Sequence, residues 1–334
     1  MQTQLRQAVV VAFGRTPYCK ARKGSFAQLH PVEYGAQTLL GVLARVPQLR
    51  PEDIGDVIMG CAMPFGVQGG NMARLIVQRA GLPDCVTAQT VNRYCSSGLQ
   101  TIATAANAIR CGEEDVVIAG GVESMSLVPM LVGAEDADPW LAEHRPEVYT
   151  TMGITAENVA RQWGISRADM DAMAVESHRR AAQAQAGGCF DGQIIPITVP
   201  GPDGGEVVVC RDEGIRPGTT AETLAGLKPC FLENGSVTAA TSSQMTDGAG
   251  FVVLMSEEKA AELGVKPLAR FVSFATGGVP AEVMGVGPIE AVPKALRKTG
   301  LTLEQMDTIE LNEAFASQAL AVIRTLGMDP ARVN

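Results

Sequence analysis

Aromatic residues are scarce in this sequence, at 4% of 334 residues, whereas its 36 glycines supply many positions without a side chain. This balance favours closely packed layers of helix on sheet and argues against a β-sandwich. The chain has no run of basic residues, and its net charge is −9. Nucleic acid is therefore excluded as an expected partner. No apolar run approaches the roughly 20 residues of a membrane-spanning helix, so no membrane span is expected.

Histidines and paired cysteine motifs are also scarce. The chain has 3 histidines, and its 8 cysteines form no C-x-x-C pair. These features argue against a metal site and indicate reduced thiols in a cytoplasmic protein. The first residues lead directly into a strand-like run, so no signal or transit peptide is expected. The cysteines are Cys19, Cys61, Cys85, Cys95, Cys111, Cys189, Cys210 and Cys230.

Hydrophobic residues, in contrast, make up 46% of the chain. The length allows two domains or one large α/β domain. Strand-like and helix-like runs alternate along the first part, which predicts a sheet covered by helices. Strands are expected at Ala8–Phe13, Ile54–Gly60, Val86–Val91 and Asp115–Ala119, and helices at Glu33–Ala44, Met72–Ala80 and after Cys95.

The alternation breaks after Gly120. The region that follows mixes helices with loops rich in glycine and proline, and the turn at 200–205 predicts a hairpin. Together with the end of the chain, it suggests an α/β unit, a long insertion and a second α/β unit. Helices are expected at Ala156–Trp163, Arg167–Gly187, Val292–Thr299 and Ala314–Leu326, and strands at Gly250–Met255, Pro267–Ala275 and Thr308–Leu311.

Cys95 is the strongest candidate nucleophile. An apolar stretch precedes it and an alanine-rich helical stretch follows, which places it where a strand turns into the N-terminus of a helix. Unpaired N–H groups at a helix N-terminus lower the pKa of a thiol and can hold an oxyanion. The alternative is a buried structural cysteine, which is the commoner fate of a single cysteine.

Five segments occur in a fixed order: VNRYCSSGLQ (91–100), AGGVESMS (119–126), MGITAENVA (152–160), VTAATSSQMTDGA (237–249) and ELNEAFASQAL (310–320). Through them the chain resembles the thiolase family, most of all the degradative 3-ketoacyl-CoA thiolases, also called acetyl-CoA acyltransferases. The resemblance runs from Val9 to the last residue. It implies that Cys95 is the nucleophile.

The resemblance also implies a thiolase-like α/β fold. In that fold two similar α/β halves stack into five layers, and a loop domain is inserted in the first half. Residues 1–119, completed by about 248–268, then form the N-terminal half. Residues 120–247 form the inserted loop or lid domain, and 269–334 form an incomplete C-terminal half.

Thiolysis of a 3-ketoacyl-CoA needs a thiolate that attacks C3, donors for the oxyanion and a proton for C2. The resemblance assigns the thiolate to Cys95. It assigns to Asn312 the amide that holds a water in an oxyanion hole. Taken alone, Asn312 before Glu-Ala-Phe-Ala predicts an ordinary helix N-cap, and the two roles are compatible.

Four further residues are implied to bind substrate or CoA. Met152 matches a methionine of the substrate pocket, and Ser243 matches a serine that contacts the pantetheine arm. Phe315 lies in the same segment as Asn312 and is assigned to the same site. Arg216, in the insertion, is expected to meet the adenine and phosphates of CoA. The structural alternatives are core packing for Met152 and a solvated surface charge for Arg216.

Two motifs of the family do not occur in the sequence. A Gly-His-Pro motif supplies the family's histidine that activates the cysteine, and a Cys-x-Gly-Gly-Gly motif supplies the acid/base for C2. His30, His144 and His178 all lack the required context. We therefore expect a truncated chain of doubtful activity, because removing a base and an acid together costs several orders of magnitude in rate.

The parent protein is thus predicted to cleave 3-ketoacyl-CoA with CoA through an acyl-Cys95 intermediate, in fatty-acid β-oxidation. Two alternatives stay open: an acetyl-CoA acetyltransferase acting on acetoacetyl-CoA, and a non-catalytic acyl-CoA-binding fragment. Thr151, where short-chain biosynthetic thiolases usually carry histidine, favours the first interpretation. The expected partners are acyl-CoA, CoA and further copies of the chain, in a homodimer or homotetramer. No cofactor is implied, since coenzyme A is a substrate.

Overall fold

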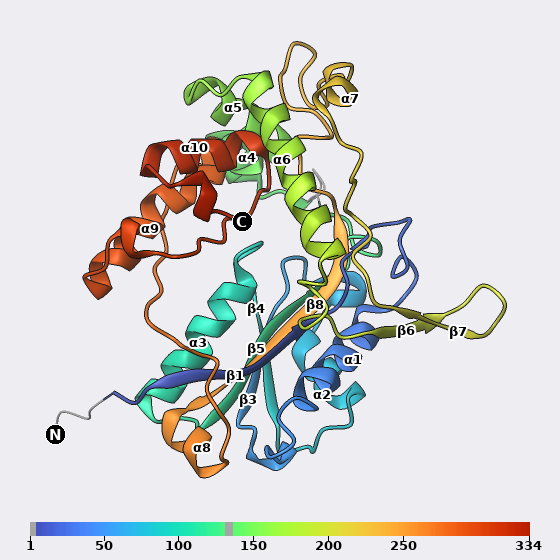
Figure 1. Cartoon of the computed structure of the whole chain (residues 1–334), viewed down its shortest axis with the longest axis vertical. Helices are drawn as coiled ribbons and strands as arrows, with labels where there is room; N and C mark the ends of the chain where they lie inside the picture. The colour runs from blue at the N-terminus through green and yellow to red at the C-terminus, as the bar shows by residue number, and fades with distance from the viewer. Residues whose placement is uncertain (1–4, 131–135) are drawn as a thin grey trace. The chain divides into compact units, whose positions relative to one another are not determined.

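The computed structural model of the chain describes residues 5–130 and 136–334. These residues form two compact units. The first comprises 5–130, Gly188–Gly214 and Gln244–Val272, and the second comprises 136–187, Ile215–Ser243 and Ser273–Asn334. Figure 1 shows by colour how the chain contributes to both. Each unit has hydrophobic clusters of its own.

The first unit is built on a mixed β-sheet. Its strands are β1 (Ala8–Arg15), β2 (Cys19–Lys20), β3 (Asp56–Gly60), β4 (Thr87–Val91), β5 (Val116–Glu123), β8 (Thr246–Ser256) and β9 (Ala269–Arg270). Their order is β4-β3-β5-β8-β1-β9, with β2 paired to β8. β3, β4 and β5 run parallel, whereas β8 is antiparallel to β5 and β1.

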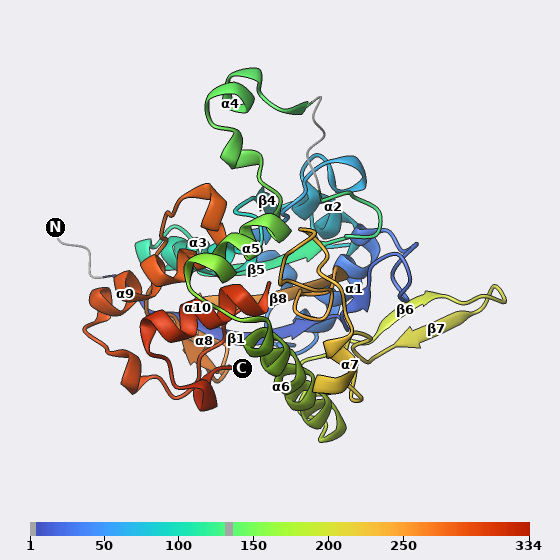
Figure 2. The same ribbon diagram turned by 90° about the horizontal axis from the view of Figure 1, so that it is seen from above.

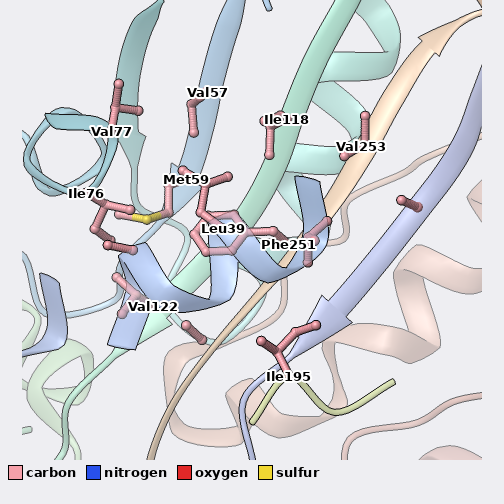
Figure 3. Close-up of a cluster of buried hydrophobic side chains, with 14 of the residues drawn as sticks. Leu39, Val57, Met59, Ile76, Val77, Ile118, Val122, Ile195, Phe251 and Val253 are labelled. Carbon is pink, nitrogen blue, oxygen red and sulfur yellow. The ribbon is translucent and has the colours of Figure 1, made fainter. Parts of the chain in front are cut away.

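Helices cover both faces of this sheet. α1 (Pro31–Leu43) and α2 (Met72–Arg79) pack on one face, in the core that Figure 3 shows in detail. α3 (Ser97–Cys111) packs on the other face. The strands serve both cores because successive side chains alternate between faces. On β5, Ile118 enters the first core and Val117 the second.

The predicted hairpin is confirmed. β6 (Ile197–Pro200) and β7 (Glu206–Val209) pair antiparallel and extend away from the sheet of the first unit (Figure 1, Figure 2). Ile195 anchors its base against α1. A Cβ at Gly41 of α1 would stand 2.3 Å from Cγ2 of Ile195, so this contact requires glycine.

The described part of the second unit is built from helices. α5 and α10 pack with the turn at 281–286 around one apolar cluster (Figure 2). The helices of this unit are α4 (Pro139–His144), α5 (Met152–Gln162), α6 (Arg167–Ala186), α7 (Ala221–Ala225), α9 (Gly287–Thr299) and α10 (Ala316–Leu326). The remaining helix, α8 (Glu257–Glu262), belongs to the first unit. Short 3₁₀ turns are η1 (Pro51–Asp53), η2 (Gly66–Gln68), η4 (Pro146–Tyr149), η5 (Ala281–Val286), η6 (Leu303–Gln305) and η7 (Pro330–Arg332). None of the helices described combines the length and the apolar content needed to cross a membrane.

Most predicted helices and strands are confirmed, but two predicted strands are wrong. Pro267–Ala275 forms only the two-residue strand β9, and Thr308–Leu311 forms no strand. Ile309 makes a single parallel bridge with Val333. A strand persists only where a neighbour completes its ladder of hydrogen bonds. In the parts of the chain that the structure describes, no strand pairs with residues 272–275.

Gly60, the last residue of β3, lies beneath the first turn of α3. A Cβ there would stand 2.6 Å from the Cβ of Ser97 and 2.8 Å from its carbonyl carbon. We expect Gly60→Ala to lower the free energy of unfolding by about 1–3 kcal/mol, because the packed backbone must shift. Urea denaturation measures this. Gly98→Ala is the matched control, since a Cβ there meets no atom within 4 Å. Equal midpoints for the two variants would contradict the close packing.

Candidate active site

Cys95 lies in the turn between β4 and α3, where the sequence places it. β4 ends at Val91, α3 begins at Ser97, and Ser96 is the N-cap residue. The structure leaves Cys95 exposed, so the alternative of a buried structural cysteine is wrong. Its role as the nucleophile stays a prediction.

The turn holds Tyr94 in the left-handed region, with φ at 47°. This conformation costs a residue other than glycine about 1–2 kcal/mol. Hydrogen bonds on both sides of the residue stabilise it. The N–H of Tyr94 donates to Oδ1 of Asn92 at 2.7 Å, and its carbonyl accepts from Oγ of Ser97 at 2.6 Å. The backbone immediately before Cys95 is therefore fixed.

The pKa of the Cys95 thiol is raised above its ordinary value. Desolvation is the largest cause, because the surrounding protein displaces part of the water that would stabilise the thiolate of this exposed residue. The N–H of Cys95 itself lowers the pKa, and the charge of Glu123 raises it. The N–H thus lowers the pKa as predicted, but its contribution is smaller than that of desolvation, and the net pKa is raised. The helix begins only at Ser97, and desolvation outweighs the nearby N–H.

Glu123, the last residue of β5, is a residue that the sequence reasoning missed. Its carboxylate accepts from the N–H groups of Ala62 at 2.7 Å and Met63 at 3.3 Å, and from Nε2 of Gln68 at 2.8 Å. Gln68 is fully buried and accepts from the N–H of Ser124 at 2.5 Å. This network fixes the loop after β3 to the end of β5. The signal in the sequence was a carboxylate at the end of an apolar run.

Asp247 has a related role: it holds Ser124 and Ser126, which follow Glu123 in the chain. The residue is fully buried in β8. Its carboxylate accepts from the N–H of Ser126 at 2.9 Å and from Oγ of Ser124 at 3.4 Å, and it also bonds Oγ of Ser126. A buried carboxylate is tolerated where several donors compensate its lost hydration. Asp247 therefore joins two of the five sequence motifs.

Glu157, in the motif at 152–160, is hydrogen-bonded to the start of the motif at 237–249, within the second unit. It is 6% exposed, and its carboxylate accepts from the N–H groups of Ser236 and Val237, both at 2.9 Å. A Cβ at Gly235 would stand 2.2 Å from Oε1 of Glu157. The carboxylate thus holds the loop that leads into the segment of Ser243.

Ser243 and Phe315 lie on neighbouring backbone segments of the second unit. The N–H of Ser243 donates to the carbonyl of Ala314 at 2.9 Å, and the N–H of Ala316 donates to the carbonyl of Thr241 at 2.9 Å. Residues 241–243 and 314–316 are therefore paired. Ser243 itself is exposed. The structure brings together these two predicted site residues from distant parts of the sequence.

Asn312 is exposed in the loop before α10. The alternative prediction of a helix N-cap at this residue is wrong, because α10 begins only at Ala316. Phe315 is the N-cap residue, and its N–H donates to Oε1 of Gln318 at 3.5 Å. The carboxylate of the next residue, Glu313, accepts a hydrogen bond from Oγ of Ser177 at 2.6 Å. The loop that carries Asn312 is thus anchored beside it.

Met152 and Phe315 share one apolar cluster in the second unit. Met152 is the first residue of α5 and is partly buried against this cluster. Phe231 meets Phe315 edge to face, with 6.0 Å between ring centres. A Cβ at Gly153 would stand 2.1 Å from the ring of Phe231, so glycine lets this ring lie close to the start of α5.

Arg216 is exposed in a loop beside α6. Its backbone N–H donates to Nδ1 of His178 at 3.2 Å. Burial, followed by the charge of Arg216, lowers the pKa of His178.

The predicted site residues divide between the two units. Cys95 belongs to the first unit, whereas the second contains Met152, Arg216, Ser243, Asn312 and Phe315.

Residues 5–130 and 136–334 contain no group of three or more His, Cys, Asp or Glu side chains arranged to hold a metal ion.

The family follows from the sequence as a whole. The model of the thiolase N-terminal domain matches residues 8–258, and that of the thiolase C-terminal domain matches residues 265–334. The chain therefore belongs to the thiolase family, a family of enzymes.

Named relatives and a solved structure agree with this. The 3-ketoacyl-CoA thiolase of Bacillus subtilis (strain 168) is 51% identical, over 99% of this chain and 86% of its own length. The peroxisomal 3-ketoacyl-CoA thiolase of Homo sapiens is 42% identical, over 100% of this chain and 79% of its own length. The crystal structure of the Bacillus anthracis acetyl-CoA acetyltransferase is 40% identical with a TM-score of 0.91, over 99% of this chain and 86% of that one.

These comparisons confirm the predicted thiolase fold. They do not show that the chain is truncated: the Bacillus subtilis relative matches 99% of this chain over 86% of its own length. The predicted domain boundaries and the roles of the site residues stay predictions.

Alkylation of Cys95 tests its electrostatic environment. Because the raised pKa keeps the thiol protonated, we expect its rate of reaction with iodoacetamide to go on rising above about pH 8.5, the ordinary pKa of a cysteine. Peptide mapping by mass spectrometry follows Cys95 separately from the other cysteines, and a short cysteine peptide is the reference. A plateau at or below the midpoint of the reference peptide would contradict this environment.

Glu157→Ala tests the anchored loop of the second unit. The variant leaves the N–H groups of Ser236 and Val237 without their acceptor. We expect the free energy of unfolding to fall by about 1–3 kcal/mol, since a buried donor without a partner costs that much. Urea denaturation measures the fall. Glu143→Ala, at a side chain with 79% exposure, is the control that should leave the midpoint unchanged.

Proposed function

We propose that this chain is a degradative thiolase, which cleaves a 3-ketoacyl-CoA with CoA to acetyl-CoA and a shortened acyl-CoA. The observation that carries the proposal is its 51% identity, over 99% of the chain, to a protein named 3-ketoacyl-CoA thiolase. The exposed Cys95 in its hydrogen-bonded turn supports it from the structure.

In the proposed reaction, the thiolate of Cys95 attacks C3 of the substrate. The C2–C3 bond breaks, its electron pair leaves with acetyl-CoA, and C2 takes up a proton. The acyl group stays on Cys95 as a thioester until the thiol of a second CoA accepts it and Cys95 regains a proton. The N–H of Cys95 is the proposed donor to the oxyanion. Neither step needs an external oxidant or reductant.

The second unit is proposed to bind the substrate. Asn312 orients a water toward an oxyanion, and its exposed position in an anchored loop supports this role. Met152 and Phe315 line the acyl pocket, which their shared apolar cluster supports. Ser243 contacts the pantetheine arm, and Arg216 contacts the adenine and phosphates of CoA. Both residues are exposed.

The general base is not among the motifs of this sequence, which has neither Gly-His-Pro nor Cys-x-Gly-Gly-Gly. Each of the three histidines makes a structural contact elsewhere. His30 caps α1, His144 stacks on Trp140 with 4.6 Å between ring centres, and His178 accepts from the N–H of Arg216. We infer that acylation of Cys95 is slow, because the two absent motifs supply the base and the acid of that step.

An acetyl-CoA acetyltransferase is the second candidate, favoured by the similarity to the Bacillus anthracis structure of that name. A non-catalytic acyl-CoA-binding protein is the third, favoured by the two motifs that the sequence does not contain. The homodimer or homotetramer, the cytoplasmic location and the lack of a cofactor stay predictions.

Acyl transfer to Cys95 tests the proposed function. We expect incubation with a medium-chain 3-ketoacyl-CoA to add one acyl group to Cys95 and release acetyl-CoA, faster than with acetoacetyl-CoA. Intact-mass spectrometry and peptide mapping measure this. Cys95→Ser should abolish the adduct, whereas Cys111→Ser, at another exposed cysteine, should retain it. A folded protein without an adduct would refute the function, and a preference for acetoacetyl-CoA would favour the second candidate.

A further inference from the structure

We propose that Asn92 and Glu123 are positioning residues for Cys95, connected to it by hydrogen bonds through the backbone of Ala62 and Tyr94. The proposal rests on the proposed function, because it requires Cys95 to accept an acyl group. All five residues belong to the first unit.

Three hydrogen bonds form the connection. The N–H of Ala62 donates to Oε2 of Glu123 at 2.7 Å, and the carbonyl of Ala62 accepts from Nδ2 of Asn92 at 3.1 Å. Oδ1 of Asn92 then accepts from the N–H of Tyr94 at 2.7 Å. The amide of Asn92 uses its donor on one backbone segment and its acceptor on another. Its own orientation is therefore fixed by Ala62, which Glu123 holds in place.

The connection ends at the residue whose backbone is strained. Tyr94 has a φ of 47°, and its side chain is 66% exposed, so packing of the phenol does not explain this conformation. Without Oδ1 of Asn92, the N–H of Tyr94 loses its acceptor and the turn can relax. Relaxation rotates the peptide between Tyr94 and Cys95. That peptide carries the N–H proposed as the oxyanion donor.

Acyl transfer is sensitive to this rotation, but alkylation is not. For acyl transfer, the sulfur and the N–H of Cys95 must both be directed at one carbonyl group. A small alkylating agent needs only an accessible thiolate. Comparison of the two reactions therefore separates positioning from access to the thiol and from its ionisation.

The charge of Glu123 gives a second reason for a positioning role. The carboxylate raises the pKa of Cys95, which reduces the fraction of thiolate. Activation of the nucleophile therefore cannot account for a carboxylate at this place. The carboxylate is instead explained by the hydrogen bonds through which it holds the 62–68 loop.

The test uses acetyl-CoA as the acyl donor and iodoacetamide as the alkylating agent. In the first reaction the thiol of Cys95 takes the acetyl group, and CoA leaves with the thiol proton. We expect Asn92→Ala to slow acetylation by about tenfold to a hundredfold, as small misplacements of a reacting group do. Its alkylation rate at high pH should stay close to that of the unaltered chain.

Two conservative variants and one control sharpen the comparison. Asn92→Asp keeps an acceptor for Tyr94 and should recover part of the acetylation rate. Glu123→Gln keeps an oxygen acceptor for Ala62 but removes the charge, so it should move the pH profile of Cys95 alkylation to lower pH. Asn107→Ala, on the exposed side of α3, is the matched control and should change neither reaction.

The outcomes distinguish this proposal from the proposed function. If the unaltered, folded chain takes up no acyl group on Cys95 from acetyl-CoA or from a 3-ketoacyl-CoA, the proposed function fails. If the unaltered chain and Asn92→Ala are acetylated at equal rates, the positioning role is overturned while the function stands. A loss of alkylation as large as the loss of acetylation would also overturn the positioning role, because it would show a general loss of access or folding.

Discussion

The close approach of α3 to β3 is the constraint on which the candidate nucleophile depends. Gly60 leaves room for Ser97, the first residue of the helix. One turn further on, Oγ1 of Thr101 donates to the carbonyl of Gly120 at 3.0 Å and ties the helix to β5. The sheet thus fixes where α3 begins. The few residues after β4 must reach that point in a tight turn, and the left-handed backbone at Tyr94 is the result.

Carboxylates in the sequence motifs shape the loops of both units. In the first unit, Glu123 holds the loop after β3 and Asp247 holds the segment after β5. In the second unit, Glu157 holds the loop before Ser243. Each accepts several hydrogen bonds from backbone N–H groups and polar side chains, which stabilise its negative charge within the protein. A motif that identifies the family therefore contains residues of two kinds: those proposed to meet the substrate, and those that build the backbone around them.

Local sequence patterns were sufficient to predict a helix or strand that buries one apolar face against the sheet. The apolar run before Cys95 and the alanines after it predicted the right turn, because both segments pack on the same sheet. Prediction failed where the outcome depends on distant partners. Residues 272–275 have no paired strand, and α10 begins at Ala316 rather than beside Asn312. The net pKa of Cys95 could not be predicted for the same reason: the backbone N–H lowers it as expected, but the larger desolvation comes from the folded surroundings.

The raised pKa has a consequence for the chemistry. A protonated thiol must lose its proton before or during attack, so a base has to act as the substrate arrives. The turn at 92–97 contains Asn, Arg, Tyr, Cys and two Ser, and at neutral pH none of these is a general base. Binding of an acyl-CoA would remove further water from the sulfur and increase the need for such a base. The turn itself therefore contributes orientation. In the proposed reaction it holds the N–H of Cys95 beside the sulfur, and removal of the proton requires a group outside the turn.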